Sequence, residues 1–491
     1  MTSSSVPPVR KLAKTRIVAT VGPASADHAT LRQLILAGVD VFRLNFAHSS
    51  HDWLSKILRT IHHISDELGF PVGVLGDLSG PKIRLGQLPD DEIMCQEGSI
   101  FHFVKHDTAA DRSHLTCTYE KLIEDVQPGD RILLADGTVS MQVTQKSADR
   151  SSASCLVTEP GLIRSRQGVN LPGVRLSTPS VTTKDQSDLI WALRHGLDFI
   201  GLSFVRSARD IRQLRGLIDS ASPTVNPLIV AKIEKTEAVD DLDAILESTD
   251  AVMVARGDLG VEAEISRVPI LQKDIIRRCN ERRIPVITAT QMLDSMQTND
   301  LPTRAEASDV ANAVIDGTDA VMLSGETAIG EHPVICVKTM EDISVEAEPL
   351  AARNTVPDQI SQQIRRAGPV TEAVAVGAVA VAVELDASLI VVATESGRTA
   401  LALSRQRSNV PILAVTHRED IARRMCLYWG VTSLKSPLVR QSVEALLESV
   451  VQWGLEHRTL KSGDRVIVVG RTDWLGDGHD LMMVHEVPQG P

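Results

Sequence analysis

Eight short apolar runs, each followed by a longer amphipathic stretch, constrain the fold of this 491-residue chain more than any other feature. Continuous apolar strands that alternate with helices are typical of a parallel sheet covered on both faces. Eight such units are the number that closes a (β/α)8 TIM barrel. The runs are RIVATVG (16–22), VFRLN (41–45), VGVLGD (72–77), FIGLSF (199–204), LIVAKIE (228–234), AVMVARGD (251–258), PVITAT (285–290) and AVMLSGE (320–326).

Two further regions differ from the barrel pattern and predict additional domains. More than a hundred residues separate the third run from the fourth, and within them RILLADGTVSMQV places a DG turn between two alternating runs, a strong hairpin signal. We expect a small β-barrel inserted at 86–177, lying over the barrel mouth as a lid. After residue 350 the runs SLIVVAT, PILAVT and RVIVVG predict an open α/β domain. The predicted domains are a flexible tail at 1–15, a barrel at 16–85 and 178–350, the lid, and a C-terminal domain at 351–491.

Composition argues against several classes of protein. The formal net charge is -12, whereas a general nucleic-acid binder needs a basic face. The six cysteines include no CxxC pair, so neither a disulfide framework nor a zinc site is expected. The longest apolar run, AVAVGAVAVAV, is too short to span a bilayer, and the N-terminus has no apolar leader. We therefore expect a cytoplasmic protein with no nucleic-acid or membrane partner.

Nearly every predicted barrel strand ends in a polar or charged residue. Because active sites in such barrels lie at the carboxyl ends of the strands, these side chains should converge on one mouth. Glu234 and Asp258 are hard oxygen ligands on neighbouring strands and suit Mg²⁺. Alternatively, Lys232 and Arg256 neutralise this carboxylate pair. The strand ends carry Arg43, Asn45, Asp77, Ser203, Lys232, Glu234, Arg256, Asp258, Thr290, Ser324 and Glu326.

The chemistry that this mouth favours is phosphoryl transfer. Arg43, Lys82, Arg84 and Lys232 provide a cationic rim for phosphate groups. A metal and several cations, with few obvious nucleophiles, fit a reaction that depends on positioning and charge neutralisation. The stretch GDLGVEAE (257–264) could hold a substrate carboxylate on its backbone N–H groups, although an ordinary helix cap is an equal alternative.

Many motifs in the chain closely resemble the pyruvate kinase family. The resemblance begins near residue 15 and continues into the C-terminal region with TESGRTALALSR and PILAVT. It implies the conversion of phosphoenolpyruvate and ADP to pyruvate and ATP, with Mg²⁺ as cofactor and Mn²⁺ as a substitute. The motifs are TRIVATVGPAS, RLNFAHSS, GPKIRLG, QGVNLPG, AKIEKTEAV, MVARGDLGVE, TATQML, PTRAEASDVANAV and MLSGETAIGEHP.

The resemblance also implies residue roles. Glu234 and Asp258 would bind the Mg²⁺. Lys232 and Arg43 would contact the transferring phosphoryl group. The amides of Gly257 and Asp258 would hold the substrate carboxylate. Thr290 would line the pocket, and Ser324 and Glu326 would help deliver the proton that turns the enolate into pyruvate. The nucleotide side would consist of Asn45, His48 and Arg84.

The chain departs from the commoner family pattern at the cation site. Many members read DTKGPEIR and NFSH, and their oxygen-bearing side chains bind K⁺. Here Ala47 and Leu78 replace the Ser and the Thr, and Lys82 replaces the Glu. Because ligand loss and cation gain occur together, we expect Lys82, beside Asp77, to act in place of K⁺, which would not be required.

The alternative is that Lys82 points to solvent while Asp77 pairs with Arg84. A smaller departure is Gln167, where many members have Lys before GVNLPG, and this puts a nucleotide contact from the lid in doubt.

The stretch TESGRT places glycine and hydroxyl groups between a predicted strand and a helix, as in a phosphate-binding nest. In the family this loop belongs to an effector site for phosphorylated sugars or nucleotides, and GRTDWLGDGHD (470–480) would be its second wall. Family members are usually homotetramers. Two rival functions stay open: a Mg²⁺-dependent lyase or aldolase that makes a pyruvate enolate, and a catalytically silent metabolite sensor. The expected effector residues are Thr394, Ser396, Gly397, Arg398 and Thr399.

Overall fold

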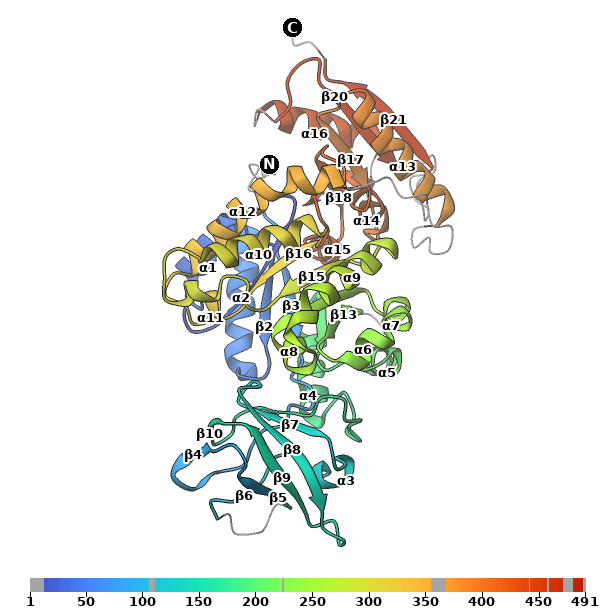
Figure 1. The fold of residues 1–491 in the computed structure, drawn as a ribbon. Coiled ribbons are helices and arrows are strands. Elements are labelled where there is room, and N and C mark those ends of the chain that lie inside the picture. Colours follow the sequence, from blue (N-terminus) through green and yellow to red (C-terminus); the bar gives the residue numbers. More distant parts are fainter. Residues whose placement is uncertain are drawn as a thin grey trace.

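Eight parallel strands close into a barrel at the centre of the molecule (Figure 1), which confirms the predicted TIM barrel. The structure is a computed structural model that describes residues 13–105, 111–222, 225–354, 368–440, 442–456, 459–470 and 480–488. The spatial order is β1-β16-β15-β14-β13-β12-β3-β2. Their bounds are β1 (Arg16–Thr20), β2 (Val41–Asn45), β3 (Gly73–Asp77), β12 (Phe199–Leu202), β13 (Leu228–Ile233), β14 (Ala251–Ala255), β15 (Val286–Ala289) and β16 (Ala320–Leu323).

Helices cover the outside of the barrel and bury their apolar faces against the strands. Capping residues set the ends of these helices. Thr182 and Thr303 cap the N-termini of α4 and α10 through reciprocal capping boxes, and Gly69 ends α2 in the left-handed backbone conformation. Among the described helices, none combines the length and apolar character that a membrane crossing requires. The helices are α1 (His28–Ala37), α2 (His51–Leu68), α4 (Thr183–Arg194), α5 (Ala208–Ala221), α6 (Thr236–Asp240), α7 (Leu242–Ser248), α8 (Arg256–Glu262), α9 (Val268–Glu281), α10 (Arg304–Ile315), α11 (Gly325–Ala328) and α12 (Pro333–Asn354), with short turns η2 (Ile265–Arg267) and η3 (Asp294–Gln297).

The inserted segment forms a mainly β lid in the shape of a half-barrel, with one short helix. A six-stranded sheet has the order β11-β7-β8-β9-β5-β6, and β10 pairs separately with β4. The predicted hairpin is β7–β8, and its turn places Ala135, Asp136 and Gly137 at positive φ. The elements are η1 (Pro89–Asp91), β4 (Glu92–Cys95), β5 (Ile100–Val104), β6 (His114–Leu115), α3 (Leu122–Asp125), β7 (Arg131–Leu134), β8 (Val139–Lys146), β9 (Ser152–Glu159), β10 (Gly161–Arg164) and β11 (Val169–Asn170).

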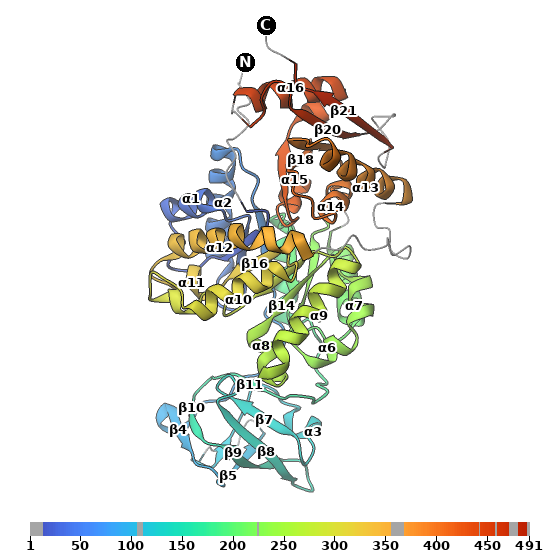
Figure 2. The same cartoon turned by 45° about the horizontal axis from the view of Figure 1, so that its top comes forward.

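The C-terminal domain is a separate α/β layer at the end of the barrel opposite the lid (Figures 1 and 2). Its five-stranded sheet has the order β19-β18-β17-β20-β21, with β21 antiparallel at the edge. Sequence analysis missed β19 and β21: β19 lacks a continuous apolar run, and β21, although it contains LMMV, is a partly exposed edge strand whose side chains alternate between half-buried and exposed. The elements are α13 (Pro369–Glu384), β17 (Leu389–Ala393), α14 (Arg398–Ser404), β18 (Ile412–Thr416), α15 (Glu419–Met425), β19 (Val431–Lys435), η4 (Pro437–Arg440), α16 (Val443–Glu456), β20 (Arg465–Gly470) and β21 (Leu481–Glu486).

An aspartate stands before every second barrel strand and braces the barrel base, the end remote from the lid. Each carboxylate accepts a hydrogen bond from the backbone N–H of the first or second residue of the neighbouring strand. Polar residues at this end of a TIM barrel usually serve stability rather than catalysis. The four bonds join Asp40 to Ile17 N at 2.8 Å, Asp198 to Val74 N at 2.9 Å, Asp250 to Ile229 N at 2.8 Å and Asp319 to Val286 N at 2.8 Å.

Arginines link three of these aspartates to the C-terminal domain. Arg16 belongs to the barrel, but its Nε also donates to the carbonyl of Tyr428 in the C-terminal domain at 2.8 Å. Buried ion pairs join the other two aspartates directly to the C-terminal domain: Arg423–Asp198 at 2.9 Å, and Arg405 and Arg407 to Asp319 at 2.9 Å each. The Arg16–Asp40 pair, at 3.2 Å, lies within the barrel and is linked to the C-terminal domain through the hydrogen bond from Arg16 to Tyr428.

Candidate active site

The carboxyl ends of β2, β3, β12 and β13 bring a buried cluster of charges together at the barrel mouth. Arg43 Nε donates to Oδ2 of Asp77 at 2.7 Å. Lys232 Nζ lies 3.2 Å from Asp77 and donates to Ser203 Oγ at 2.7 Å. The same ammonium lies 3.0 Å from Oε1 of Glu234. The predicted convergence of these strand ends is therefore observed.

The charge states of this cluster follow from burial and pairing. Burial acts to raise the pKa of Asp77, but Lys232 and Arg43 together hold it below its ordinary value. Burial likewise opposes the charged form of Lys232, yet Asp77 and Glu234 raise its pKa. The ammonium thus stays protonated and available to a phosphoryl group.

Glu234 and Asp258 form a donor set that fits a divalent cation. Burial raises the pKa of Glu234, Lys232 opposes the shift, and the nearby Asp258 carboxylate adds to it. Glu234 Oε2 accepts the amide of Phe204 at 2.7 Å. In the described part of the chain, no cation or hydrogen-bond donor pairs with the half-buried Asp258 carboxylate. A hard cation would relieve the repulsion between the two carboxylates.

Arg256 does not neutralise that pair, contrary to one of the alternatives from the sequence. Its guanidinium turns to the loop after β15 and donates to the carbonyls of Thr290 at 2.8 Å and Gln291 at 3.0 Å. Thr290 and Gln291 both have positive φ, at 67° and 53°, so their backbone is strained and needs such support. Arg256 is therefore a positioning residue for Thr290.

Thr290 and Gly257 contact each other directly. The amide of Gly257 donates to Thr290 Oγ1 at 2.7 Å. This amide is one of the two that we expect to hold a substrate carboxylate. A bound carboxylate would therefore take the place of the threonine oxygen as its acceptor.

Ser324 and Glu326 follow β16 and lie together, but with different environments. Both oxygens of Glu326 accept backbone amides, from Ser324 at 2.7 Å and from Leu293 at 3.1 Å, and burial raises the pKa of Glu326. The Ser324 hydroxyl is buried and has no hydrogen-bond partner among the described residues. Glu326 therefore fixes the backbone at Ser324 and Leu293 through both of its carboxylate oxygens.

His48 marks a strongly cationic part of the mouth. Partial burial lowers its pKa, and the nearby charges of Arg84, Lys82 and Arg43 lower it further. Asn45, one turn earlier, uses its side-chain oxygen to accept the amide of Ala47 at 3.0 Å. These residues lie together as expected.

Lys82 and Arg84 lie between the barrel mouth and the lid. Arg84 donates to the carbonyl of Arg166 in the lid at 3.0 Å, and Asp77 pairs with Arg43 and Lys232 instead of Arg84. Lys82 is exposed, and it lines a small cavity of about 30 Å³ that Asp258 and lid residues share.

Two contacts near the mouth were not expected from the sequence. Buried Lys235 pairs with Glu262 at 2.7 Å and fastens α8 to the end of β13. The only indication of this ion pair in the sequence was the second lysine of AKIEKTEAV. It was not sufficient to predict the pair, because the partner carboxylate lies 27 residues away along the chain. Gln167 is also engaged locally, because its side-chain oxygen accepts the amide of Arg164 at 2.6 Å.

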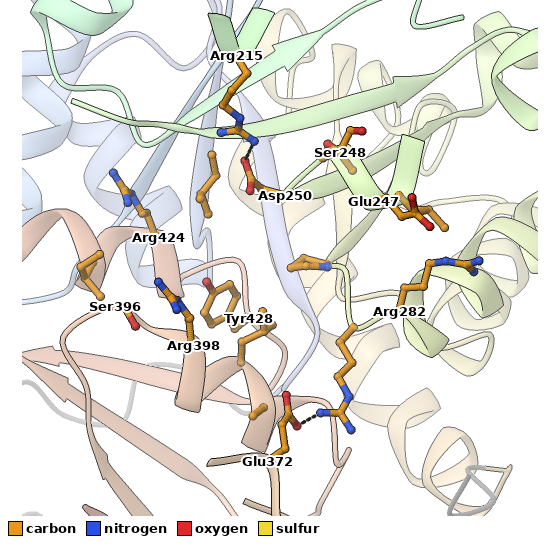
Figure 3. A pocket seen from close by; sticks show the side chains of 18 of the residues that line it. Arg215, Glu247, Ser248, Asp250, Arg282, Glu372, Ser396, Arg398, Arg424 and Tyr428 are labelled. Carbon is orange, nitrogen blue, oxygen red and sulfur yellow. Dashed lines mark hydrogen bonds and ion pairs between the residues drawn. The ribbon is translucent and has the colours of Figure 1, made fainter. Parts of the chain in front are cut away.

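The predicted effector residues lie at the opposite end of the barrel from the mouth (Figure 1). The hydroxyl of Thr394 accepts the amide of Gly397 at 3.0 Å, and Thr394 and Thr399 are buried. Ser396 and Arg398 line a cavity between the barrel and the C-terminal domain (Figure 3). Most of the expected second wall, 471–479, lies outside the described residues.

Comparison with known proteins decides the family. A family model described as the pyruvate kinase barrel domain matches residues 12–337, and one described as the pyruvate kinase alpha/beta domain matches 372–485. The chain belongs to the pyruvate kinase family. It is therefore an enzyme of the phosphotransferase class, and the family normally uses Mg²⁺.

Individual pyruvate kinases resemble the chain along nearly its whole length. The pyruvate kinase of Geobacillus stearothermophilus is 40% identical over 479 residues, which cover 96% of this chain and 80% of the relative. Pyruvate kinase 2 of Synechocystis is 42% identical over 485 residues, covering 96% and 79%. The crystal structure of a pyruvate kinase from Cryptosporidium parvum superposes with a TM-score of 0.89 at 34% identity, covering 97% of this chain and 96% of that one.

Proposed function

We propose that the enzyme transfers the phosphoryl group of phosphoenolpyruvate to ADP with Mg²⁺ and without K⁺. The observation that carries this proposal is the cluster in which Lys232 contacts both Asp77 and Glu234, next to the half-buried carboxylate of Asp258. Such a cluster combines a fixed cation for the reacting phosphoryl group with two carboxylates whose oxygens suit a divalent metal ion.

Positively charged groups would position the phosphoryl group and stabilise the transition state. Lys232 and Arg43 would contact the phosphoryl oxygens, and Lys232 would also stabilise the negative charge that develops on the enolate oxygen. Glu234 and Asp258 would hold the Mg²⁺, which supplies further charge neutralisation when bound. Both cations are anchored by Asp77, so they need not reorganise during the reaction.

The remaining substrate groups would be bound at the ends of β14, β15 and β16. The amides of Gly257 and Asp258 would hold the substrate carboxylate, with Thr290 beside it. The Ser324 hydroxyl would pass a proton to the enolate carbon, and Glu326 would keep Ser324 in place. Asn45, His48 and Arg84 would contact the nucleotide, because they lie in the cationic region next to the lid.

Lys82 would replace K⁺ as the monovalent charge of the site. Its neighbour Leu78 is buried and offers no side-chain oxygen, and Ala47 offers none either. Lys82 lines the same small cavity as Asp258, so its ammonium can reach the mouth when the lid closes. A tethered ammonium carries the same unit charge as K⁺ without needing an oxygen cage.

We also propose that this enzyme shares the cellular location, the oligomeric state and the regulation of its family. It would be a cytoplasmic homotetramer that also accepts Mn²⁺ and responds to a sugar-phosphate or nucleotide effector through Thr394, Ser396, Gly397, Arg398 and Thr399. The support is the family membership and the position of Ser396 and Arg398, which line the cavity between the barrel and the C-terminal domain.

The test is pyruvate formation from phosphoenolpyruvate, with ADP and Mg²⁺ each supplied or omitted. We expect pyruvate and ATP in equal amounts only when both are present. Pyruvate release that does not depend on ADP would indicate a lyase or phosphatase instead. No turnover under any of these conditions, with or without sugar phosphates, would indicate a metabolite sensor.

A further inference from the structure

Two histidines and a glutamate meet on the outer surface of the barrel, where α1 and α2 lie side by side (Figures 1 and 2). His28, His63 and Glu67 each offer a ligand atom, and these three atoms lie within 4.8 Å of one another. All three residues are exposed. Among the described residues, no other three His, Cys, Asp or Glu side chains bring ligand atoms this close together.

Helical spacing explains why these side chains meet. His63 and Glu67 are four residues apart on α2, and His28 and Arg32 have the same spacing on α1, so each pair lies on one helix face. The ring centroids of His28 and His63 are 6.1 Å apart, and Arg32 Nε lies 3.5 Å from Glu67. The two helices therefore run in the same direction, with matching turns in contact.

The imidazoles of α1 and α2 have no hydrogen-bond or ion-pair partner within the described part of the chain. A second close pair of histidines, in the lid, differs in this respect. The ring centroids of His102 and His114 are 5.4 Å apart, but Nδ1 of His102 lies 3.1 Å from Ser154 Oγ and Nδ1 of His114 lies 2.7 Å from Asp111. The ring nitrogens on the barrel surface are thus the ones left for a ligand.

Two imidazoles and one carboxylate form a donor set that suits Zn²⁺ and not Mg²⁺. Imidazole nitrogen is a common ligand of zinc, whereas Mg²⁺ prefers oxygen donors and keeps most of its water. Donor atoms about 2.1 Å from a tetrahedral zinc lie about 3.4 Å from one another, so these exposed side chains need to move by only about 1 Å. A water molecule would complete the tetrahedron.

Glu67 has one competitor for the metal, the guanidinium of Arg32. Their side chains are 42% (Arg32) and 46% (Glu67) exposed, and an ion pair that is open to water contributes little to stability. A metal ion can therefore displace Arg32 at little cost. The competition also makes a specific prediction, because removal of Arg32 should strengthen metal binding.

We propose that His28, His63 and Glu67 bind a Zn²⁺ ion that bridges α1 and α2. Because α1 precedes β2 and α2 follows it, the bridge encloses the strand that carries Arg43 to the barrel mouth. The unfolded chain does not hold the three ligands together, so the ion stabilises the folded barrel. This site is structural and takes no part in phosphoryl transfer, so its failure leaves the kinase assignment unchanged.

The experiment is calorimetric titration of the full-length chain with Zn²⁺ at about pH 7.5, where imidazole is mostly unprotonated, with excess Mg²⁺ for the oxygen ligands at the mouth. The test variants are His63→Gln and Glu67→Gln. His114→Gln, from the histidine pair in the lid, and Asp66→Asn, an exposed carboxylate beside Glu67, are the matched controls. We expect each test variant to weaken binding about tenfold or more, since one of three protein ligands is lost, and each control to keep wild-type affinity.

Two further measurements separate coordination from general attraction of a cation. Arg32→Gln should bind Zn²⁺ more tightly than wild type, because Glu67 loses its competing partner. Saturating Zn²⁺ should raise the Tm of the wild type by about 2 °C or more and leave the Tm of His63→Gln unchanged. If His63→Gln fails to fold, His28→Gln replaces it, with the same expected loss of affinity.

Three results would overturn the proposal. The first is wild-type affinity in His63→Gln, and the second is an equal loss of affinity in Asp66→Asn and Glu67→Gln, which would indicate attraction by surface charge alone. The third is no binding to the wild-type chain up to about 0.1 mM Zn²⁺. Asp258→Asn reports zinc at the barrel mouth, and binding that only this variant abolishes would equally contradict a site on α1 and α2.

Discussion

Lys232 and Glu234 form a buried ion pair, with Nζ 3.0 Å from Oε1, although both sit within one short stretch at the end of β13. Residues two apart on a strand face the same side, so the sequence KIE directs both side chains into the barrel. The pair joins the group that would neutralise the phosphoryl oxygens to a group that would hold the metal. A single ion pair therefore fixes both the ammonium for the phosphoryl group and a carboxylate for the metal in the proposed reaction.

Replacing this lysine should affect activity and stability together. We expect Lys232→Met to lower kcat by about a thousandfold or more, since a fixed charge at the transition state is lost. The same change leaves Glu234 without its ion-pair partner and should lower the free energy of unfolding by about 3 kcal/mol. Steady-state kinetics and urea unfolding measure the two effects. The exposed Lys338→Met should change neither, and a Lys232→Met enzyme with wild-type kcat would exclude the proposed role.

Removing the guanidinium of Arg256 should disturb catalysis indirectly. We expect Arg256→Met to lower kcat/KM about tenfold to a hundredfold, because Thr290 loses the support of its strained backbone and shifts relative to Gly257. Thr290→Ser keeps the hydroxyl and should stay close to wild type. Steady-state kinetics with phosphoenolpyruvate as the varied substrate measure kcat/KM for both variants. Normal kcat/KM in Arg256→Met would show that Thr290 needs no such support.

The ion pair between Asp198 and Arg423 predicts a pH dependence of stability. Burial raises the pKa of Asp198 to about 6, although Arg423 opposes the shift. Because the folded-state pKa lies above the unfolded value, this group's stabilising contribution is complete below about pH 4 and is lost as pH rises through about 6. Two pKa units correspond to about 3 kcal/mol.

Urea unfolding between pH 4 and pH 8 tests this pH dependence. Asp198→Asn should remove the decrease in the free energy of unfolding that this group causes as pH rises through about 6. Arg423 keeps its ion pair with Glu419, at 2.8 Å, in this variant. The exposed Asp219→Asn is the control and should retain the wild-type slope. An unchanged slope in Asp198→Asn would show that Asp198 stays ionised throughout.

Local sequence patterns were sufficient for the fold and for the placement of the mouth residues. Eight continuous apolar runs define eight buried strands, and closing them brings Asp77, Lys232 and Asp258 to one end whatever their separation in sequence. The hairpin of the lid was predictable because its DG turn adopts positive φ. Alternation along β13, continued to the residue after its end, was enough to place Lys232 and Glu234 on one face.

Contacts between distant segments were not predictable in the same way. Arg256 ends a strand like its neighbours, yet it turns to the carbonyls of Thr290 and Gln291, which sequence alone does not reveal. The aspartates at the barrel base do recur in similar contexts, GVDV, GLDF, STDA and GTDA, and this repeat was a usable signal. Their arginine partners were not predictable, because Arg423 lies 225 residues from Asp198.

The most direct test of the account is the rate of pyruvate formation from phosphoenolpyruvate and Mg-ADP in tetramethylammonium buffer, before and after K⁺ is added, for wild type and Lys82→Gln. We predict a wild-type rate that K⁺ changes less than about twofold. For Lys82→Gln we predict a rate at least about tenfold lower without K⁺, since the unit charge near the phosphates is gone. A wild-type enzyme that works only after K⁺ is added, or a variant as active as wild type without K⁺, would contradict the role given to Lys82.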